Sequence, residues 1–185
     1  MDPMNQLIVA ILAGGLGTRL RSVVSDRPKV LAEIGGKPFL AYLLDHLSSF
    51  GFGTVVLCTG YLGEQIAQRF GKRYGEMELF YSQESSPLGT AGALRLALPL
   101  LKSESALVVN GDSFCDADLR GFWEWHRERE ADASMLLVEV PDTRRYGRVS
   151  VDNKGRVIRF EEKNEEGAPG WINAGIYLIR RRLLE

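Results

Sequence analysis

The start of the chain decides its fold: residues 7–21 read LIVAILAGGLGTRLR. Residues 7–12 are all apolar, which is the pattern of a strand buried on both faces of a sheet. This strand runs directly into residues 14–21, which hold three glycines, a threonine and two arginines. Glycines let backbone amides come close to a phosphate, and arginines supply paired donors for its oxygens. The stretch therefore predicts an α/β protein with a phosphate-binding loop after its first strand.

Short apolar runs alternate with longer amphipathic segments through the rest of the first half of the chain. We expect strands at residues 7–12, 54–59, 77–81 and 105–109, and helices at 39–47, opened by Pro38, at 64–70 and at 91–101. A βαβαβαβ order of this kind predicts a parallel sheet that is covered by helices and joined by right-handed crossovers. Ligands bind such sheets beyond the carboxyl ends of the strands.

The second half has a different pattern, which predicts antiparallel strands. We expect a charged helix at 118–130, a strand at 133–140, a hairpin of 148–151 and 156–160, and a last strand at 172–179. His126 is expected on a solvated helix face, and the basic run 180–182 at a solvated helix start. The whole chain is expected to be one domain, residues 1–185.

The composition excludes several classes of protein. Of the 185 residues, 45% are hydrophobic and 25% are charged, which is typical of a globular domain. The net charge of −1 offers no electrostatic footprint for nucleic acid. No apolar run is long enough for a membrane span, and no signal peptide pattern precedes residue 7. Cys58 and Cys115 lie far apart and form no zinc motif. We therefore expect a cytoplasmic protein without a membrane or nucleic-acid partner.

The glycine loop does not match the two best-known phosphate loops. A dinucleotide fingerprint that starts at Gly15 places Leu20 where Gly or Ala belongs, which argues against an NAD-dependent oxidoreductase. A P-loop fails because Gly36-Lys37 is followed by Pro38. The alternative is a tight turn in which only the glycines matter. Three glycines beside two arginines favour phosphate binding.

A carboxylate follows the fourth expected strand, at Asp112 in the sequence Asn110-Gly111-Asp112. Mg²⁺ prefers oxygen ligands and takes few of them from protein when a nucleotide supplies the rest. Because this strand end should lie beside the glycine loop, Asp112 is a candidate ligand for a metal–nucleotide complex. The alternative is an aspartate that forms a turn. Lys29 is either a solvated charge or a further phosphate contact.

Together these segments resemble the sugar-1-phosphate nucleotidylyltransferases, also called nucleotide-sugar pyrophosphorylases. The resemblance is carried, in order, by residues 12–20, Pro28-Lys29, Glu84, 87–92, 110–112, Tyr146-Gly147, 160–163 and 173–175. Residues 15–26 and 58–61 are most similar to the guanylyltransferases that act on D-glycero-α-D-manno-heptose 1-phosphate.

The resemblance implies a fold and a reaction. The fold is a Rossmann-like three-layer α/β/α nucleotidyltransferase fold, with a mostly parallel mixed sheet and an antiparallel sugar-binding portion. The reaction joins an NTP to a sugar 1-phosphate, giving an NDP-sugar and pyrophosphate, with Mg²⁺ as cofactor. For the most similar subgroup the substrates are GTP and the heptose 1-phosphate. The resemblance leaves a homo-oligomer open.

Site residues follow from the family position by position. The resemblance implies catalytic roles for Arg19, Lys29 and Asp112, with Asp112 as the metal ligand. Nucleotide-binding positions are Leu12, Ala13, Gly14, Gly15, Gly17, Thr18, Arg19, Glu84, Pro87, Gly89, Thr90 and Asn110. Sugar-phosphate-binding positions are Gly111, Tyr146, Gly147, Glu162, Lys163 and Asn173.

The choice of base has its own chemical argument. Guanine presents adjacent N1–H and N2–H donors that suit a carboxylate, and Glu84 resembles the residue that meets the base in guanylyltransferases. Uracil and thymine lack that pair of donors. The alternative is that Glu84 is a solvated loop charge.

The chain departs from the family pattern at two places. Val30 follows Lys29 where a proline is usual, and no candidate for a second acidic metal ligand precedes Glu185. The second departure predicts truncation at the C-terminus. The alternatives are a uridylyltransferase, a mannose-1-phosphate guanylyltransferase, and a catalytically silent regulator that binds a nucleotide-sugar.

Overall fold

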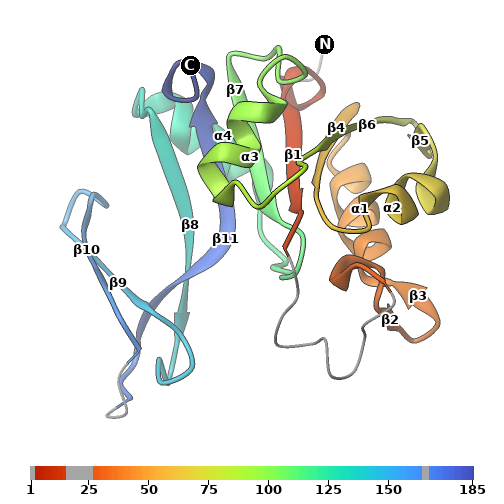
Figure 1. Cartoon of the computed structure of the whole chain (residues 1–185). Helices are drawn as coiled ribbons and strands as arrows, with labels where there is room; N and C mark the ends of the chain where they lie inside the picture. Colours follow the sequence, from red (N-terminus) through yellow and green to blue (C-terminus); the bar gives the residue numbers. More distant parts are fainter. Residues whose placement is uncertain (1–2, 16–26, 164–166) are drawn as a thin grey trace. The chain divides into compact units, whose positions relative to one another are not determined.

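A computed structural model describes residues 3–15, 27–163 and 167–185 (Figure 1). These residues divide into two units. Unit 1 comprises residues 1–134 and 177–185, and unit 2 comprises residues 135–176. The chain therefore leaves unit 1 once and returns to it at its end.

The sheet of unit 1 has the strand order β7-β1-β4-β6-β5. The strands are β1 (Ile8–Ala13), β4 (Thr54–Thr59), β5 (Arg73–Tyr74), β6 (Met77–Gln83) and β7 (Ser105–Asn110). Strand β1 pairs in parallel with both β4 and β7, β4 pairs in parallel with β6, and only β5 runs antiparallel to its neighbour among these pairs. The expected mostly parallel mixed sheet is confirmed.

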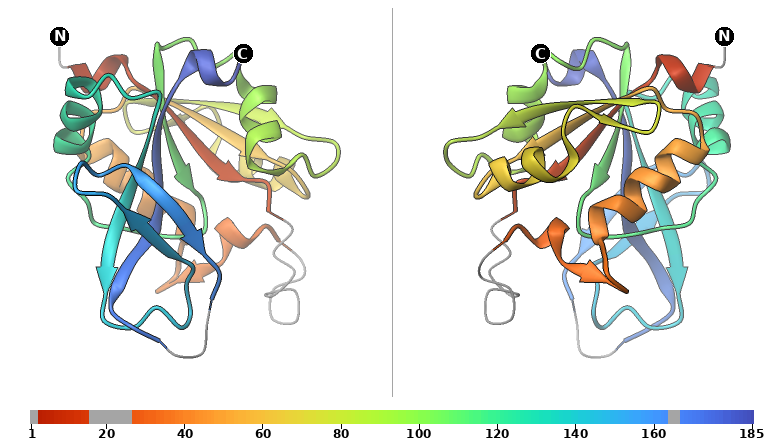
Figure 2. Two further views of the ribbon diagram at one scale, coloured as in Figure 1. Left: turned by 90° about the vertical axis from the view of Figure 1, so that its left-hand side faces the viewer. Right: turned by 90° about the vertical axis from the view of Figure 1, so that its right-hand side faces the viewer.

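Helices cover both faces of this sheet. They are α1 (Phe39–Ser49), α2 (Gly63–Phe70), α3 (Gly89–Ala97) and α4 (Leu119–Glu128). Figure 2 shows α3 on one side of the strands, with α1 and α4 on the other. Alternate residues of β1, β4 and β7 face α3, where Leu94, Ala97 and Leu101 complete a buried cluster. Each large aliphatic side chain in such a core contributes about 1.5–3 kcal/mol by leaving water.

Helix α3 is shorter than the sequence pattern predicted. It ends at Ala97 rather than at residue 101. Pro99 explains the difference, because it has no amide to continue the helical hydrogen bonds; Leu98 keeps helical φ and ψ, and residues 98–100 form a turn. The carbonyls of Leu98 and Leu101 accept hydrogen bonds from the guanidinium of Arg181 instead. The basic run 180–182, expected to be solvated, therefore includes a side chain that fastens the end of this helical segment.

Several short elements have no periodic signal in the sequence. They are the 3-10 helices η1 (Pro3–Gln6), η2 (Lys29–Leu31) and η3 (Arg181–Leu183), and the strands β2 (Glu33–Ile34) and β3 (Lys37–Pro38). Gly35 and Gly36 join β2 to β3 with φ values of +60° and +80°, a geometry that favours glycine. Pro38 ends β3, so α1 begins one residue after the proline that was expected to open it.

Unit 2 is built from antiparallel strands. They are β9 (Arg148–Val151), β10 (Val157–Glu161), most of β8 (Ala133–Val140) and the first part of β11 (Gly170–Arg180). Strand β9 pairs with β10 on one side and with β11 on the other. The hairpin turn is held by the Asp152 carboxylate, which accepts from the amides of Lys154 and Arg156. The expected antiparallel portion is confirmed.

Among the described residues, no helix is long and apolar enough to cross a membrane.

Candidate active site

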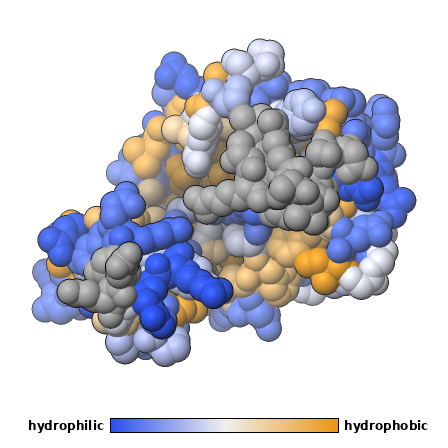
Figure 3. Space-filling view, turned by 60° about the horizontal axis from the view of Figure 1, so that its bottom comes forward, coloured by the Kyte–Doolittle hydropathy of each residue, from blue (hydrophilic) through white to orange (hydrophobic). Residues whose placement is uncertain are grey.

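The carboxyl ends of four parallel strands bring most of the predicted nucleotide-binding residues of unit 1 to one edge of the sheet. Ala13 is level with Thr59 in the ladder of β1 and β4, and Thr59 is level with Gln83 of β6. Gly14, Gly60 and Glu84, which follow these residues, therefore meet at the same edge. This edge lies on the side toward which β1 points, where hydrophilic and apolar areas alternate on the surface (Figures 1 and 3).

Contacts of its backbone and of its carboxylate hold Glu84 in place. The backbone amide of Glu84 donates to the carbonyl of Thr59 at 2.9 Å, which extends the ladder of β4 and β6 by one hydrogen bond. Its Oε2 accepts from the amide of Leu88 at 3.0 Å. Burial raises the pKa of the neighbouring Cys58 thiol to about 12, and the negative charge of Glu84 adds to that rise. Glu84 is therefore a half-buried charge at the sheet edge and not a freely solvated one.

Residues 87–90 surround the start of α3. Gly89 is the first residue of this helix and has a φ of +70°, which only glycine adopts at little cost. Pro87, Leu88 and Thr90 are exposed. Together with the exposed ring of Tyr61, the Leu88 side chain supplies apolar surface at this edge.

The predicted phosphate loop is described only at its beginning. Leu12 and Ala13 belong to β1, and Ala13 is buried, so a ligand at the strand end meets their backbone rather than their side chains. Among the described residues, no heavy atom lies within 4 Å of a Cβ built on Gly15. Gly17, Thr18 and Arg19 lie outside the described residues.

Gly111 allows β7 to come close to β1 just before Asp112. Its amide donates to the carbonyl of Leu12 at 2.9 Å, and a Cβ at this position would lie 2.7 Å from the same carbonyl oxygen. The Val30 side chain fills the space on its other side, at 3.1 Å from that Cβ. Val30 is buried in η2, whose first residue is Lys29. This packing brings Lys29 close to Asp112, which directly follows Asn110 and Gly111 in the chain.

Lys29 and Asp112 form an ion pair although 83 residues separate them in the chain. The lysine Nζ donates to Oδ2 of the carboxylate at 2.8 Å. Their side chains are 34% and 51% exposed, so water screens the pair and its contribution to stability is small. The geometry therefore brings together two of the three residues for which a catalytic role was predicted, while the third, Arg19, lies outside the described residues.

The described carboxylates fit a metal that is bound jointly with a ligand. No group of three or more His, Cys, Asp or Glu side chains in the described ranges is arranged to hold an ion. A single exposed carboxylate suits Mg²⁺ when phosphates and water complete the octahedron. Asp112 meets that requirement.

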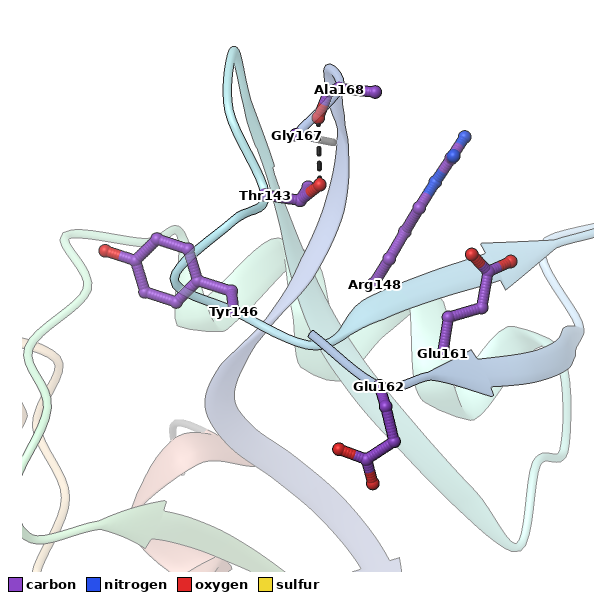
Figure 4. A pocket seen from close by; sticks show the side chains of 7 residues that line it. All are labelled: Thr143, Tyr146, Arg148, Glu161, Glu162, Gly167 and Ala168. Carbon is purple, nitrogen blue, oxygen red and sulfur yellow. Dashed lines mark hydrogen bonds between the residues drawn. The ribbon is translucent and has the colours of Figure 1, made fainter. Parts of the chain in front are cut away.

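A pocket in unit 2 collects three of the predicted sugar-binding positions in one small region. It is lined by Thr143, Tyr146, Arg148, Glu161, Glu162, Gly167 and Ala168, and its volume is about 240 Å³ (Figure 4). Gly147 lies between two lining residues and packs against the carbonyl of Glu161, at 3.1 Å from a Cβ built on it. Tyr146, Gly147 and Glu162 thus lie in the same region of unit 2.

The two acidic residues of this pocket face opposite ways. Glu161 is level with Arg148 in the ladder of β9 and β10, and their side chains point to the same side, whereas Glu162 points to the other (Figure 4). Hydrogen bonds from Arg159 and Ser150 hold the pKa of Glu161 below its usual value. Glu161 is therefore engaged within the hairpin, whereas Glu162 is exposed and points to the other side.

Lys163 and Asn173 complete the predicted set in unit 2, but neither lines this pocket. Lys163 is exposed just beyond β10. Asn173 lies in β11, and its Oδ1 accepts from the amide of Gly175 at 2.8 Å.

Sequence reasoning missed Thr143, which shapes the loop before Tyr146. Its amide and its hydroxyl both donate to the carbonyl of Ala168, at 3.1 and 2.9 Å, and its own carbonyl accepts from the amide of Tyr146 at 2.8 Å. The partner lies 25 residues away. No local sequence pattern predicts a contact between residues so far apart in the chain.

The comparisons with known proteins agree with this geometry. A family model described as nucleotidyl transferase matches residues 8–185. The chain is 42% identical to the D-glycero-alpha-D-manno-heptose 1-phosphate guanylyltransferase of Aneurinibacillus thermoaerophilus, over 95% of this chain and 75% of that protein. It is 35% identical to the mannose-1-phosphate guanylyltransferase of Mycobacterium tuberculosis, over 98% of this chain and 51% of that protein.

The fold is also that of a solved structure. HddC from Yersinia pseudotuberculosis superposes with a TM-score of 0.88 at 35% identity, covering 97% of this chain and 79% of that one. A second crystal structure of HddC is complexed with GMP-PN. The expected Rossmann-like α/β nucleotidyltransferase fold is thereby confirmed, and the chain belongs to the nucleotidyl transferase family.

Proposed function

We propose that this chain transfers a guanylyl group from GTP to D-glycero-α-D-manno-heptose 1-phosphate, giving GDP-heptose and pyrophosphate. The proposal is supported by the identity of 42% to a guanylyltransferase of that specificity. The structural observation that carries it is the Glu84 carboxylate, which is fixed at the sheet edge by its contact with the Leu88 amide. We propose that residues 1–185 are one nucleotidyltransferase domain, because the family model matches residues 8–185.

The reaction needs in-line attack and neutralised charge rather than a covalent enzyme intermediate. An oxygen of the sugar phosphate attacks the α-phosphorus of GTP, and the bond from that phosphorus to the pyrophosphate oxygen breaks. The backbone at Gly14 and Gly15 lies at the open strand end, where it suits the triphosphate. Lys29 neutralises charge near the attacked phosphorus, and Arg19 stabilises the departing pyrophosphate. Leu12, Ala13, Pro87, Gly89, Thr90 and Asn110 form the walls around the nucleoside.

Asp112 is the proposed ligand for Mg²⁺. When bound, this ion would neutralise phosphate charge and orient both substrates. Gly111 keeps Asp112 at the junction of β1 and β7. Lys29 has to exchange its contact with Asp112 for one with phosphate when the substrates bind.

The sugar phosphate is proposed to occupy the pocket of unit 2. The backbone at Tyr146 and Gly147 approaches the sugar, and Glu162 accepts hydrogen bonds from its hydroxyls. Lys163 binds the phosphate, and Asn173 adds a further polar contact. Glu162 supports this assignment because it lines the pocket, whereas hairpin contacts occupy the Glu161 carboxylate.

The direct test measures pyrophosphate release in the presence of Mg²⁺. GTP is paired with the 1-phosphates of heptose, mannose, glucose and N-acetylglucosamine, and the heptose compound is paired with UTP, dTTP, ATP and CTP. We expect turnover with GTP and the heptose 1-phosphate. Efficient turnover with UTP or dTTP would contradict the assignment of Glu84, and binding of GTP without pyrophosphate release would favour a regulator.

Glu84→Gln tests the base contact itself. Because the Leu88 amide requires an acceptor, the glutamine carbonyl takes the place of Oε2 and its NH₂ group turns toward the guanine donors. We expect kcat/KM for GTP to fall about 10- to 100-fold, with a melting temperature close to that of the unmodified chain. Equal GTP kinetics in both proteins would refute the contact.

Mannose 1-phosphate is the second candidate substrate. The identity of 35% to a mannose-1-phosphate guanylyltransferase supports it, over 98% of this chain. The same panel of sugar phosphates separates the two candidates by their kcat/KM values with GTP.

A further inference from the structure

We propose that Gly60 determines the nucleotide specificity of this chain. Its missing side chain gives the Glu84 carboxylate a seat at the ends of β1 and β4, and from that seat Glu84 reads guanine. The inference rests on the proposed function, in which Glu84 meets the base. Gly60 is a positioning residue, because it acts on the nucleotide through Glu84.

The seat is formed by two glycines that directly follow the neighbouring strands β1 and β4. A Cβ built on Gly60 would lie 2.8 Å from the carbonyl oxygen of Gly14 and 3.1 Å from Oε1 of Glu84. A Cβ built on Gly14 would lie 3.0 Å from the same Oε1. A side chain at either position would therefore press on this carboxylate oxygen and displace it by a few tenths of an ångström.

Backbone conformation does not account for glycine at position 60. Gly60 is absent from the described glycines with positive φ, so another residue could adopt its backbone geometry. Lack of space for a side chain is the remaining physical reason for a glycine at position 60. The closest atom is a backbone carbonyl oxygen, which cannot move aside by a change of rotamer.

Glu84 is fixed from three directions, so its position is sensitive to a shift of this seat. Its amide is tied to Thr59, Oε2 is tied to the amide of Leu88, and Oε1 lies against the two glycines. Within the described part of the chain, Oε1 accepts no hydrogen bond, and each carboxylate oxygen has two lone pairs. The carboxylate therefore keeps acceptor capacity for both guanine donors, N1–H and N2–H.

Inosine triphosphate isolates one of these two hydrogen bonds. Hypoxanthine keeps the N1–H and O6 of guanine but lacks the 2-amino group. The ratio of kcat/KM for GTP to kcat/KM for ITP therefore reports how well the carboxylate reaches N2–H. A general loss of stability or of phosphate binding lowers both values and leaves their ratio unchanged.

The experiment compares this ratio in the unmodified chain, in Gly60→Ala and in a matched control, Gly53→Ala. Gly53 precedes β4 at its opposite end, where an added methyl group meets the side chain of Asn5 and not Glu84. We expect the unmodified chain to prefer GTP by about 10- to 100-fold. Gly60→Ala should reduce this preference to within about threefold of unity, and Gly53→Ala should keep it.

A folded Gly60→Ala protein with the original ratio would overturn the inference. If that variant does not fold, Gly14→Ala decides instead, because Oε1 of Glu84 is the nearest atom to its new methyl group and an unchanged ratio there overturns the inference equally. Failure of the unmodified chain to use GTP would contradict the proposed function itself. Guanylyl transfer without any preference over ITP would contradict only the positioning of Glu84.

Discussion

Lys29 and Asp112 show how a pair of residues can matter more for charge than for stability. Both side chains are partly exposed, and pairs of this kind contribute about 0–1 kcal/mol to folding. Their contact has a chemical consequence, because the lysine occupies an oxygen that a metal ion would otherwise use. Binding of the metal and of the triphosphate should therefore depend on each other.

Lys29→Met removes the ammonium group that is proposed to neutralise phosphate charge in the transition state. Turnover should therefore fall by about 100-fold or more. The melting temperature should change little. In the absence of nucleotide, the variant should bind Mn²⁺ more tightly than the unmodified chain, as measured by electron paramagnetic resonance.

Lys102→Met serves as the control for this prediction, because Lys102 is an exposed lysine outside the site. It should leave both turnover and Mn²⁺ affinity unchanged. Weaker Mn²⁺ binding in Lys29→Met would refute the competition between lysine and metal.

For single residues, the sequence predicted which candidate side chains lie near the strand ends but not the contacts that fix them. Gly14, Glu84 and Asp112 follow expected strands, so their meeting at one edge was predictable. The seat that Gly60 provides for Glu84 was not predictable, because it depends on the register between β1 and β4. The tie between Thr143 and Ala168 likewise joins separate segments of the chain.

Helix α4 corrects one expectation about an element. His126 was expected on a solvated face, yet it is 1% exposed, and its Nδ1 lies 2.7 Å from the hydroxyl oxygen of Ser134. The many charged residues of this helix concealed its buried side. Burial lowers the pKa of His126, the positive charge of Arg180 lowers it further, and Asp132 opposes this effect.

A dependence of stability on pH follows from this buried histidine. Below the ordinary histidine pKa of about 6.5, the unfolded chain binds a proton before the folded chain does. The free energy of unfolding should therefore fall as the pH drops below about 6.5. The free energy of unfolding can be measured by urea denaturation at several pH values between 5 and 7.5. Its change with pH should be smaller for His126→Gln than for the unmodified chain. Equal changes for the two proteins would contradict the prediction.

The elements themselves were predicted well where their periodicity was clear. The expected strands at 54–59 and 133–140 coincide with β4 and β8. Elements of two residues, such as β2 and β3, are too short to show any period, and their glycine turn gives the one local signal. Helix α3 shows the opposite error, because its apolar spacing continues past Pro99, where the missing amide ends the regular helix.

For the whole molecule, the proposed nucleotide and sugar-phosphate positions fall mostly in different units. The nucleotide residues described in unit 1 and the pocket of unit 2 belong to different parts of the chain. Substitutions in unit 2 should therefore alter the kinetics of the sugar phosphate and leave those of the nucleotide nearly unchanged.

Thr143→Val tests this separation. The variant loses the hydroxyl that donates to Ala168, so the turn leading to Tyr146 loosens. We expect KM for the sugar phosphate to rise about 5- to 10-fold, because small displacements weaken productive orientation. KM for GTP should stay within about twofold.

Thr143→Ser retains the hydroxyl and should restore most of the affinity for the sugar phosphate. Thr54→Val, at the start of β4, controls for loss of a threonine hydroxyl elsewhere. A rise in KM for GTP alone would refute the separation of the two substrates between the units.

The return of the chain to unit 1 after residue 176 has a consequence for its synthesis. Tyr177, Ile179 and Leu184 pack against the buried cluster built from β1, β4, β7 and α3. A ribosome therefore delivers every residue of unit 2 before it supplies these last side chains of the unit 1 core. During translation, unit 2 has the opportunity to fold first, and unit 1 has to wait with part of its apolar surface uncovered.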